Sequence, residues 1–195
     1  MTYTGYHFVG ADQRERFGSR RKIEAGKTYR IKGPPALCEH GLHASKRIID
    51  ALSYAPPDAK YLCGVELDDT ILLDSDKAVA TQRTVLWMLD VETLLHEFAC
   101  WCAEQALKAE RKAGRESDPR SWNALRVKRL WLKGKSTDKE LAAAWAAARA
   151  AGAWTAAWTA ARAAARVAGE AAWTAGAAQD RKLERMVKRA RGSIQ

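Results

Sequence analysis

Alternating polar and apolar positions predict short β-strands in the first ninety residues. The segment "TGYHFVG" (residues 4–10) carries aromatic and β-branched side chains, and residues 27–33 alternate Tyr and Ile with polar side chains. Residues 36–45 have the pattern of a strand broken by a glycine. Residues 61–67 and 71–73 have the pattern of two strands separated by an acidic turn. This order of elements predicts a small β-rich domain.

The pattern becomes helical in two places. Residues 46–55 carry apolar side chains at helical spacing, and Ser45 stands where it could cap this helix at its N-terminus. From Val91 onward, apolar residues recur every three or four positions and no strand pattern returns. We therefore predict an α+β fold, with an α/β domain over residues 1–90 and an all-α domain over residues 91–195.

Two helix starts in the second domain carry recognisable capping chemistry. Asp118 precedes Pro119, which suits an N-cap followed by proline at the first helical position. Thr137 and Glu140 have the spacing of a capping box, in which each side chain bonds the other residue's backbone N–H. These signals predict helix starts at both places.

The segment from residue 143 to residue 176 consists almost entirely of Ala, Arg, Trp, Thr and Gly. At about 100° per residue, Trp145 and Trp154 would point in opposite directions on one straight helix. Breaks near Gly152 and Gly169 resolve this conflict and give three helices. We expect a stacked helical array in which Trp fills gaps between Ala faces, and a single continuous helix is the alternative.

The formal net charge of +10 favours contact with nucleic acid, a nucleotide or an acidic protein surface. A solvated basic surface that aids solubility is the alternative interpretation. The basic cluster near the C-terminus is the best candidate for binding nucleic acid, because most of its side chains have no packing role. Its members are Arg181, Lys182, Arg185, Lys188, Arg189 and Arg191.

Signal and cysteine patterns bear on location and metal binding. The chain shows no N-terminal signal pattern and no apolar run long enough for a membrane span, so we expect a cytoplasmic protein without a membrane partner. Its four cysteines lack the spacing of a disulfide framework. Cys38, His40, His43 and Cys63 have the residue types of a zinc site, but no paired C-x-x-C accompanies them. We expect buried structural cysteines and assign no metal.

The segments "CEHGLHASKRIIDALSYA" and "YLCGVELDD" resemble a domain of unknown function that recurs in bacteriophage and prophage proteins. Their order of elements is also similar to that of ADP-ribosyltransferase-like folds. By this resemblance, His7 matches a first-strand His, Ser45 a strand-end Ser or Thr, and Tyr54 a Tyr at a helix end. With His43, these residues would line a cleft for a nucleotide, and the implied cofactor is NAD.

The resemblance is incomplete at the residue that such transferases need most. They carry a catalytic Glu on a late strand, and the strand-rich part of this chain ends before a clear equivalent. Glu66 falls on an early strand, so the role is not transferred to it. The resemblance thus implies an ADP-ribosyltransferase-like fold with a degenerate cleft. Taken singly, Tyr54 could also be a core residue and His43 could fix a turn.

The helical half is similar to the Ala-rich domain of a predicted bacterial immunity protein family found near polymorphic toxins. The similar stretch begins at "CAEQAL" and includes "STDKELAAAWAAARAA". Together the two resemblances imply a phage-type accessory protein of a bacterial host that binds and modulates a host or defence-system component. NAD-dependent ADP-ribosyl transfer and nucleic-acid binding through the basic C-terminal region are the alternatives. Dimerisation through the helical face is left open.

Overall fold

The computed structural model describes residues 2–16, 20–115, 117–150 and 169–193. Within these ranges the chain is a mixed α+β protein, with a five-stranded antiparallel sheet and five helices. The α+β class expected from the sequence is thereby confirmed, with the long helices in the C-terminal part. The likeness to ADP-ribosyltransferases stays a prediction.

Contacts divide the chain into two compact units. One unit comprises Met1–Glu92 together with Leu183–Gln195, and the other comprises Thr93–Lys182. The end of the last helix therefore belongs with the sheet, whereas the domains proposed above were residues 1–90 and 91–195.

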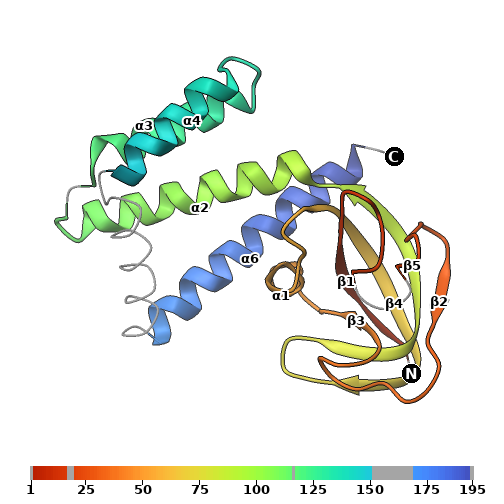
Figure 1. Ribbon diagram of the computed structural model, residues 1–195. Coiled ribbons are helices and arrows are strands. Elements are labelled where there is room, and N and C mark those ends of the chain that lie inside the picture. The colour runs from red at the N-terminus through yellow and green to blue at the C-terminus, as the bar shows by residue number, and fades with distance from the viewer. Residues whose placement is uncertain (1, 17–19, 116, 151–168, 194–195) are drawn as a thin grey trace. The chain divides into compact units, whose positions relative to one another are not determined.

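The sheet is built around two long strands, β4 (Ala59–Leu73) and β5 (Ala78–Asp90), which form a hairpin (Figure 1). Strand β1 (Tyr3–Gly10) pairs with the outer side of β4. Strands β2 (Thr28–Arg30) and β3 (Leu42–Ala44) both pair with the other side of β5, at different positions along it. All of these pairings are antiparallel, so hairpins and loops suffice to connect the strands.

One further backbone pairing bends the sheet back on itself. Directly after β3, the N–H of Ser45 donates to the carbonyl of Tyr6 at 3.0 Å, and the N–H of Tyr6 donates to the carbonyl of Ser45 at 2.8 Å. Because Tyr6 lies on β1, the series β1, β4, β5 and β3 closes into a ring. Closure of this kind leaves less unpaired strand edge.

The same pairing explains why Ser45 is not a helix cap. Helix α1 (Ile48–Ser53) starts after Arg47, and no side chain caps it. Ser45 is instead 2 % exposed and engaged in the bridge to Tyr6. The capping role predicted for Ser45 was wrong, because tertiary strand pairing takes this residue into the sheet.

The acidic turn expected between two strands is also wrong. β4 runs through it as one strand with an irregular register between Asp68 and Ile71, and Asp69 has a φ of 67°. The strand continues because β5 pairs on both sides of the irregularity, at Gln82 and at Ala80. The acidic residues that suggest a turn in the sequence therefore form a β-bulge within a continuous strand.

The core of this unit comes from one face of every strand. Its apolar members are Val9, Ile23, Tyr29, Leu42, Ala44, Cys63, Val65, Leu67, Ala78, Ala80 and Val85. Burying a single Val or Leu side chain contributes about 1.5–3 kcal/mol, so this cluster supplies the main driving force for forming the sheet.

The second unit contains three consecutive helices, α2 (Glu92–Lys112, of which Glu92 counts with the sheet), α3 (Pro119–Trp131) and α4 (Asp138–Ala150). α2 and α3 share a core made of Cys100, Leu107 and Leu125.

The helix starts expected from the sequence are confirmed. The N–H of Arg120 donates to Asp118 Oδ1 at 2.8 Å, and Pro119 opens α3. At the next helix, the N–H of Glu140 donates to Thr137 Oγ1 at 3.2 Å, and the N–H of Thr137 donates to Glu140 Oε2 at 2.8 Å. Both ends of the predicted capping box are therefore formed.

The Ala/Trp-rich segment is described only at its two ends. On α4, the buried residues are Ala144 and Ala148. α6 (Gly169–Gly192) buries Leu183 and Val187. The helix expected between Gly152 and Gly169, with Trp154, lies outside the described residues.

Candidate functional site

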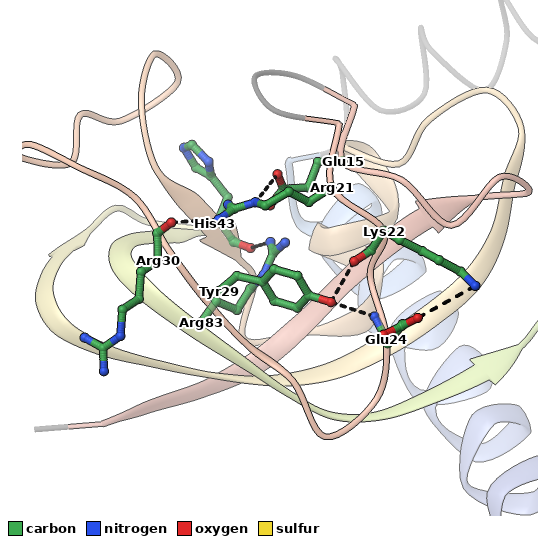
Figure 2. Close-up of polar contacts among 8 residues, drawn as sticks. All are labelled: Glu15, Arg21, Lys22, Glu24, Tyr29, Arg30, His43 and Arg83. Carbon is green, nitrogen blue, oxygen red and sulfur yellow. Dashed lines mark hydrogen bonds and ion pairs between the residues drawn. The ribbon is translucent and has the colours of Figure 1, made fainter.

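The most unusual residue of the sheet unit is Arg83, on β5. It is 2 % exposed, and its Nη1 donates a hydrogen bond of 3.0 Å to the carbonyl of His43 (Figure 2). Its Nε is buried and has no hydrogen-bond partner among the residues that the structure describes. A buried guanidinium with an unsatisfied donor is rare, because desolvating a charge is costly unless an anion or a full set of acceptors replaces water.

Strand alternation explains why Arg83 points inward. Its partners on both neighbouring strands are core residues, Leu67 on β4 and Tyr29 on β2. Two positions further along, Val85 is also fully buried. Arg83 therefore occupies a core position, where burial lowers its pKa from the usual value. Arginine nevertheless remains protonated in proteins, so the core holds a positive charge.

A second arginine lies beside this position with its charge balanced. Arg21 Nε and Nη2 donate to the two carboxylate oxygens of Glu15, each at 3.0 Å, and Arg21 Nη1 donates to the carbonyl of Arg30 at 2.8 Å (Figure 2). Close by, the Tyr29 hydroxyl donates to the carbonyl of Lys22 at 2.8 Å and accepts from the N–H of Glu24 at 2.8 Å. The Glu15 carboxylate is thus already used by Arg21.

Two histidines adjoin Arg83 and are held neutral. Burial, the charge of Arg83 and His43 together lower the pKa of His7 well below its usual value. Burial also lowers the pKa of His43, whose Nε2 accepts a hydrogen bond of 3.3 Å from the N–H of Cys38. Both side chains keep some solvent-accessible surface. At neutral pH they can offer hydrogen bonds but add no positive charge.

The thiol in this cluster is not activated. Cys63 faces His7 across the β1–β4 pairing and is fully buried, and burial raises its pKa to about 12. The thiolate needed for nucleophilic catalysis is therefore not populated at neutral pH. The expectation of a buried structural cysteine is met at Cys63, but it is wrong for Cys38, which is exposed in a turn with a φ of 66°.

Metal-binding geometry is not found in the described part of the chain. There, no group of three or more His, Cys, Asp or Glu side chains is placed to hold an ion. His40 bonds the carbonyl of Lys32 at 2.9 Å, away from Cys63 in the core.

The four residues expected to line a nucleotide cleft are thus divided. The structure places His7 and His43 together beside Arg83, and it uses Ser45 in the backbone bridge. Tyr54 is 51 % exposed, so its interpretation as a core residue was wrong. Its hydroxyl donates to Asp76 Oδ2 at 2.6 Å and accepts from Lys77 Nζ at 3.1 Å.

A surface hollow of about 240 Å³ lies elsewhere on the same unit. Its lining includes the aromatic side chains Tyr6 and Trp87 and the cations Lys46 and Arg191. Trp87 rests directly against Gly64, since a Cβ at that glycine would lie 2.1 Å from the indole. Tyr6 meets Trp87 edge-on, with ring centroids 6.2 Å apart.

Arg191, from the last turn of α6, covers this tryptophan. Its guanidinium carbon lies 4.1 Å from the centre of the Trp87 ring, which is a cation–π contact. Arg191 is exposed, and stacking on the indole leaves the N–H groups at the rim of the guanidinium pointing outward in its plane.

The remaining basic residues of the predicted cluster follow Arg191 back along α6. Arg185, Lys188 and Arg191 succeed one another in three-residue steps, and all are exposed, as is Arg189. In the helical unit, Arg181 is exposed and Lys182 lies over the Trp101 ring, 6.0 Å from its centre. Of the side chains around the hollow, sequence reasoning found Arg191 but missed Lys46 and Trp87, which come from distant segments.

Comparison with known proteins identifies one domain. A domain of unknown function, DUF7666, is found over residues 4–97. This confirms that the first part of the chain carries a domain of unknown function, whereas the phage origin and the likeness of the helical half to immunity proteins stay predictions. No curated protein matches the chain, and no solved structure matches it. No helix in the described ranges has the length and apolar character needed to cross a membrane.

Proposed function

We propose that the protein binds single-stranded nucleic acid through the hollow at Trp87 and the basic face of α6. The observation that carries this proposal is the stacking of Arg191 on Trp87, 4.1 Å from the ring, inside a hollow that also contains Tyr6 and Lys46. Cations interleaved with aromatic rings are the recurring solution for binding a flexible polymer with charged phosphates and flat bases.

The stacking prepares Arg191 for phosphate. Because the indole holds the guanidinium plane in place, less side-chain freedom is lost when the outward N–H groups bind phosphate oxygens. The exposed residues Arg185, Lys188 and Arg189 continue the positive surface along the helix. Phosphates spaced along a strand can then meet successive cations, which is the electrostatic component of nucleic-acid affinity.

The size of the hollow favours a single strand. At about 240 Å³ it is smaller than the roughly 300–1,000 Å³ of typical small-molecule pockets. It therefore suits one unit of a polymer better than a whole dinucleotide cofactor. A base that is unpaired can enter and meet Tyr6 or the outer face of the Arg191 guanidinium, whereas a stacked base pair cannot.

Fluorescence anisotropy with a short labelled single strand tests the proposal. We expect affinity to fall steeply between about 50 and 200 mM salt, with log K against log salt declining by about 0.7 for each phosphate contacted. Arg191→Gln should weaken binding and reduce that slope by about 0.7. Trp87→Leu should also weaken binding, because it removes the ring that holds the Arg191 guanidinium in place.

The matched control is Arg111→Gln, which removes the same charge from an exposed position in the last turn of α2. Nucleic acid that fails to bind at low salt, or equal losses in Arg111→Gln and Arg191→Gln, would refute the proposal. Tighter binding of duplex than of single strand would refute its choice of substrate.

Three expectations from the resemblances stay predictions. These are binding to a host or defence-system component, NAD-dependent ADP-ribosyl transfer, and dimerisation through the helical face. Incubation of the full chain with labelled NAD and cell extract would test the second, and an unmodified extract without a thermal shift by NAD would exclude it.

A further inference from the structure

We propose that Arg83 anchors an interior binding site for a small oxyanion, a carboxylate or phosphate group, within the ring of strands. This site is separate from the hollow at Trp87, and no residue is shared between them. The proposal rests on the donor set of Arg83, on the lack of an ion pair with it among the described residues, and on the placement of the two histidines.

Arg83 has a buried, unsatisfied donor on the edge of the guanidinium that binds oxyanions best. Nη1 is used by the carbonyl of His43 at 3.0 Å, and the buried Nε has no partner among the described residues. Nε and Nη2 together form a planar fork that matches two oxygens of a carboxylate or phosphate. Arg21 uses this same edge on Glu15, with both bonds at 3.0 Å (Figure 2). An anion would bind Arg83 in the same way in this proposal.

No protein carboxylate forms an ion pair with Arg83 in the described part of the chain, although the charge of Glu15 acts on it. Ion pairs formed there include Arg21–Glu15 but none with Arg83. Glu15 is the acidic side chain whose charge reaches Arg83, and both of its oxygens are bonded to Arg21. A buried charge left in this state is strongly unfavourable, so an external anion is the simplest group to offset it.

The neighbouring side chains restrict the ligand to a small group. Arg83 lies among core residues such as Val85 and Tyr29, and its Nε is buried, so the proposed ligand is a group of a few atoms rather than a whole nucleotide. His7 and His43 are of intermediate exposure, and in this proposal the ion enters beside them. For His7, no hydrogen bond from its ring is found within the described residues, so one of its nitrogens can donate to the same anion.

The competing explanation is that Arg83 is a purely structural residue. Its bond to the carbonyl of His43 joins β5 to β3, and a purely structural role would need nothing further. The two explanations differ in what Arg83→Met does. If Arg83 has a purely structural role, Arg83→Met should destabilise the protein under all conditions. If Arg83 binds an anion, Arg83→Met should leave the ligand-free protein as stable or more stable, and the protein should no longer respond to anions.

The experiment measures thermal unfolding of the full chain in inorganic phosphate, in acetate and in chloride, at equal ionic strength. We expect phosphate or acetate, but not chloride, to stabilise the native protein. Above the dissociation constant, each ten-fold rise in ligand should raise the ratio of folded to unfolded protein about ten-fold. Stabilisation by both phosphate and acetate identifies a general oxyanion site, and stabilisation by one of them identifies its preferred group.

Two variants and one spectrum make the outcome decisive. Arg83→Met should lose the response, and Arg191→Gln, which removes a surface cation from the proposed nucleic-acid site, should keep it. In the unmodified protein, the Nε–Hε signal of Arg83 should shift on titration with the stabilising anion, a readout that holds even if Arg83→Met does not fold. An unmoved Nε–Hε signal, or an unaltered anion response in Arg83→Met, would overturn the proposal.

This test is independent of nucleic-acid binding. Arg83→Met should bind a labelled single strand as the unmodified protein does, because Arg83 lies in the core and not on the surface of α6. Failure of one proposal can therefore be told from failure of the other.

Discussion

Acidification should destabilise the protein through His7. Burial, Arg83 and His43 lower the pKa of His7 well below its usual value in the folded state, while in the unfolded chain it returns to about 6.5. Below pH 6.5, the unfolded chain therefore binds a proton at His7 that the folded protein does not. The free energy of unfolding falls as the pH falls through this range, by about 1.4 kcal/mol per pH unit, until the folded-state pKa is reached.

At about pH 5.5 the predicted loss from His7 is about 1.4 kcal/mol relative to neutral pH. His43 acts in the same direction, because burial also lowers its pKa. His7→Gln removes the titrating group from β1, so it should recover about 1.4 kcal/mol of this acid-induced loss. The measurement is urea unfolding of both proteins at pH 7.5 and pH 5.5, with the change in unfolding free energy between the two pH values compared.

His40→Gln is the matched control, since His40 is an exposed histidine in a neighbouring turn. It should retain the full pH dependence of the unmodified protein. If His7→Gln loses as much stability on acidification as the unmodified protein, the burial of a neutral His7 beside Arg83 is not what limits stability at low pH.

Two further predictions concern backbone geometry and are measured by thermal unfolding. Gly41 has a φ of +135°, and an added Cβ would lie 2.2 Å from Val79 Cγ2, so Gly41→Ala should lower the free energy of unfolding by about 1–3 kcal/mol. Gly33 has a φ of +81° but open space around it, so Gly33→Ala should lower it less. Equal losses in the two variants would contradict the steric argument. Thr137→Ala removes the acceptor for the Glu140 N–H and should cost about 1 kcal/mol; Ser136→Ala leaves that bond in place, and a similar loss there would count against the capping box.

Local chemistry made some elements predictable from the sequence. An N-cap depends on residues two or three positions apart, so Asp118 and the Thr137–Glu140 pair could be placed correctly without knowing the fold. Elements fixed by distant partners were harder. β5 was not predicted, because it places Arg83 inside and Leu86, 50 % exposed, outside, which inverts the usual pattern. β5 is a strand because it pairs with three other strands.

The site divides in the same way. His7 was expected to line a site, and the effect of His43 on its pKa depends on the ring of strands, which the sequence did not reveal. Arg83 could not be identified as a candidate site residue from the sequence. Its position in the core can be recognised only once the strand that carries it is known. Ser45 was misassigned to a helix cap for a related reason, since a serine before a helix is a local signal that a distant strand overrode.

The return of residues 183–195 to the unit of residues 1–92 has a consequence for how the chain folds. The ribosome adds about 5–20 residues each second, and domains encoded early in a chain commonly fold while the rest is still being made. Here Leu183 and Val187, both buried, belong to a unit whose first strand begins at Tyr3. The segment that completes the sheet unit is therefore made only after the whole helical unit has been synthesised.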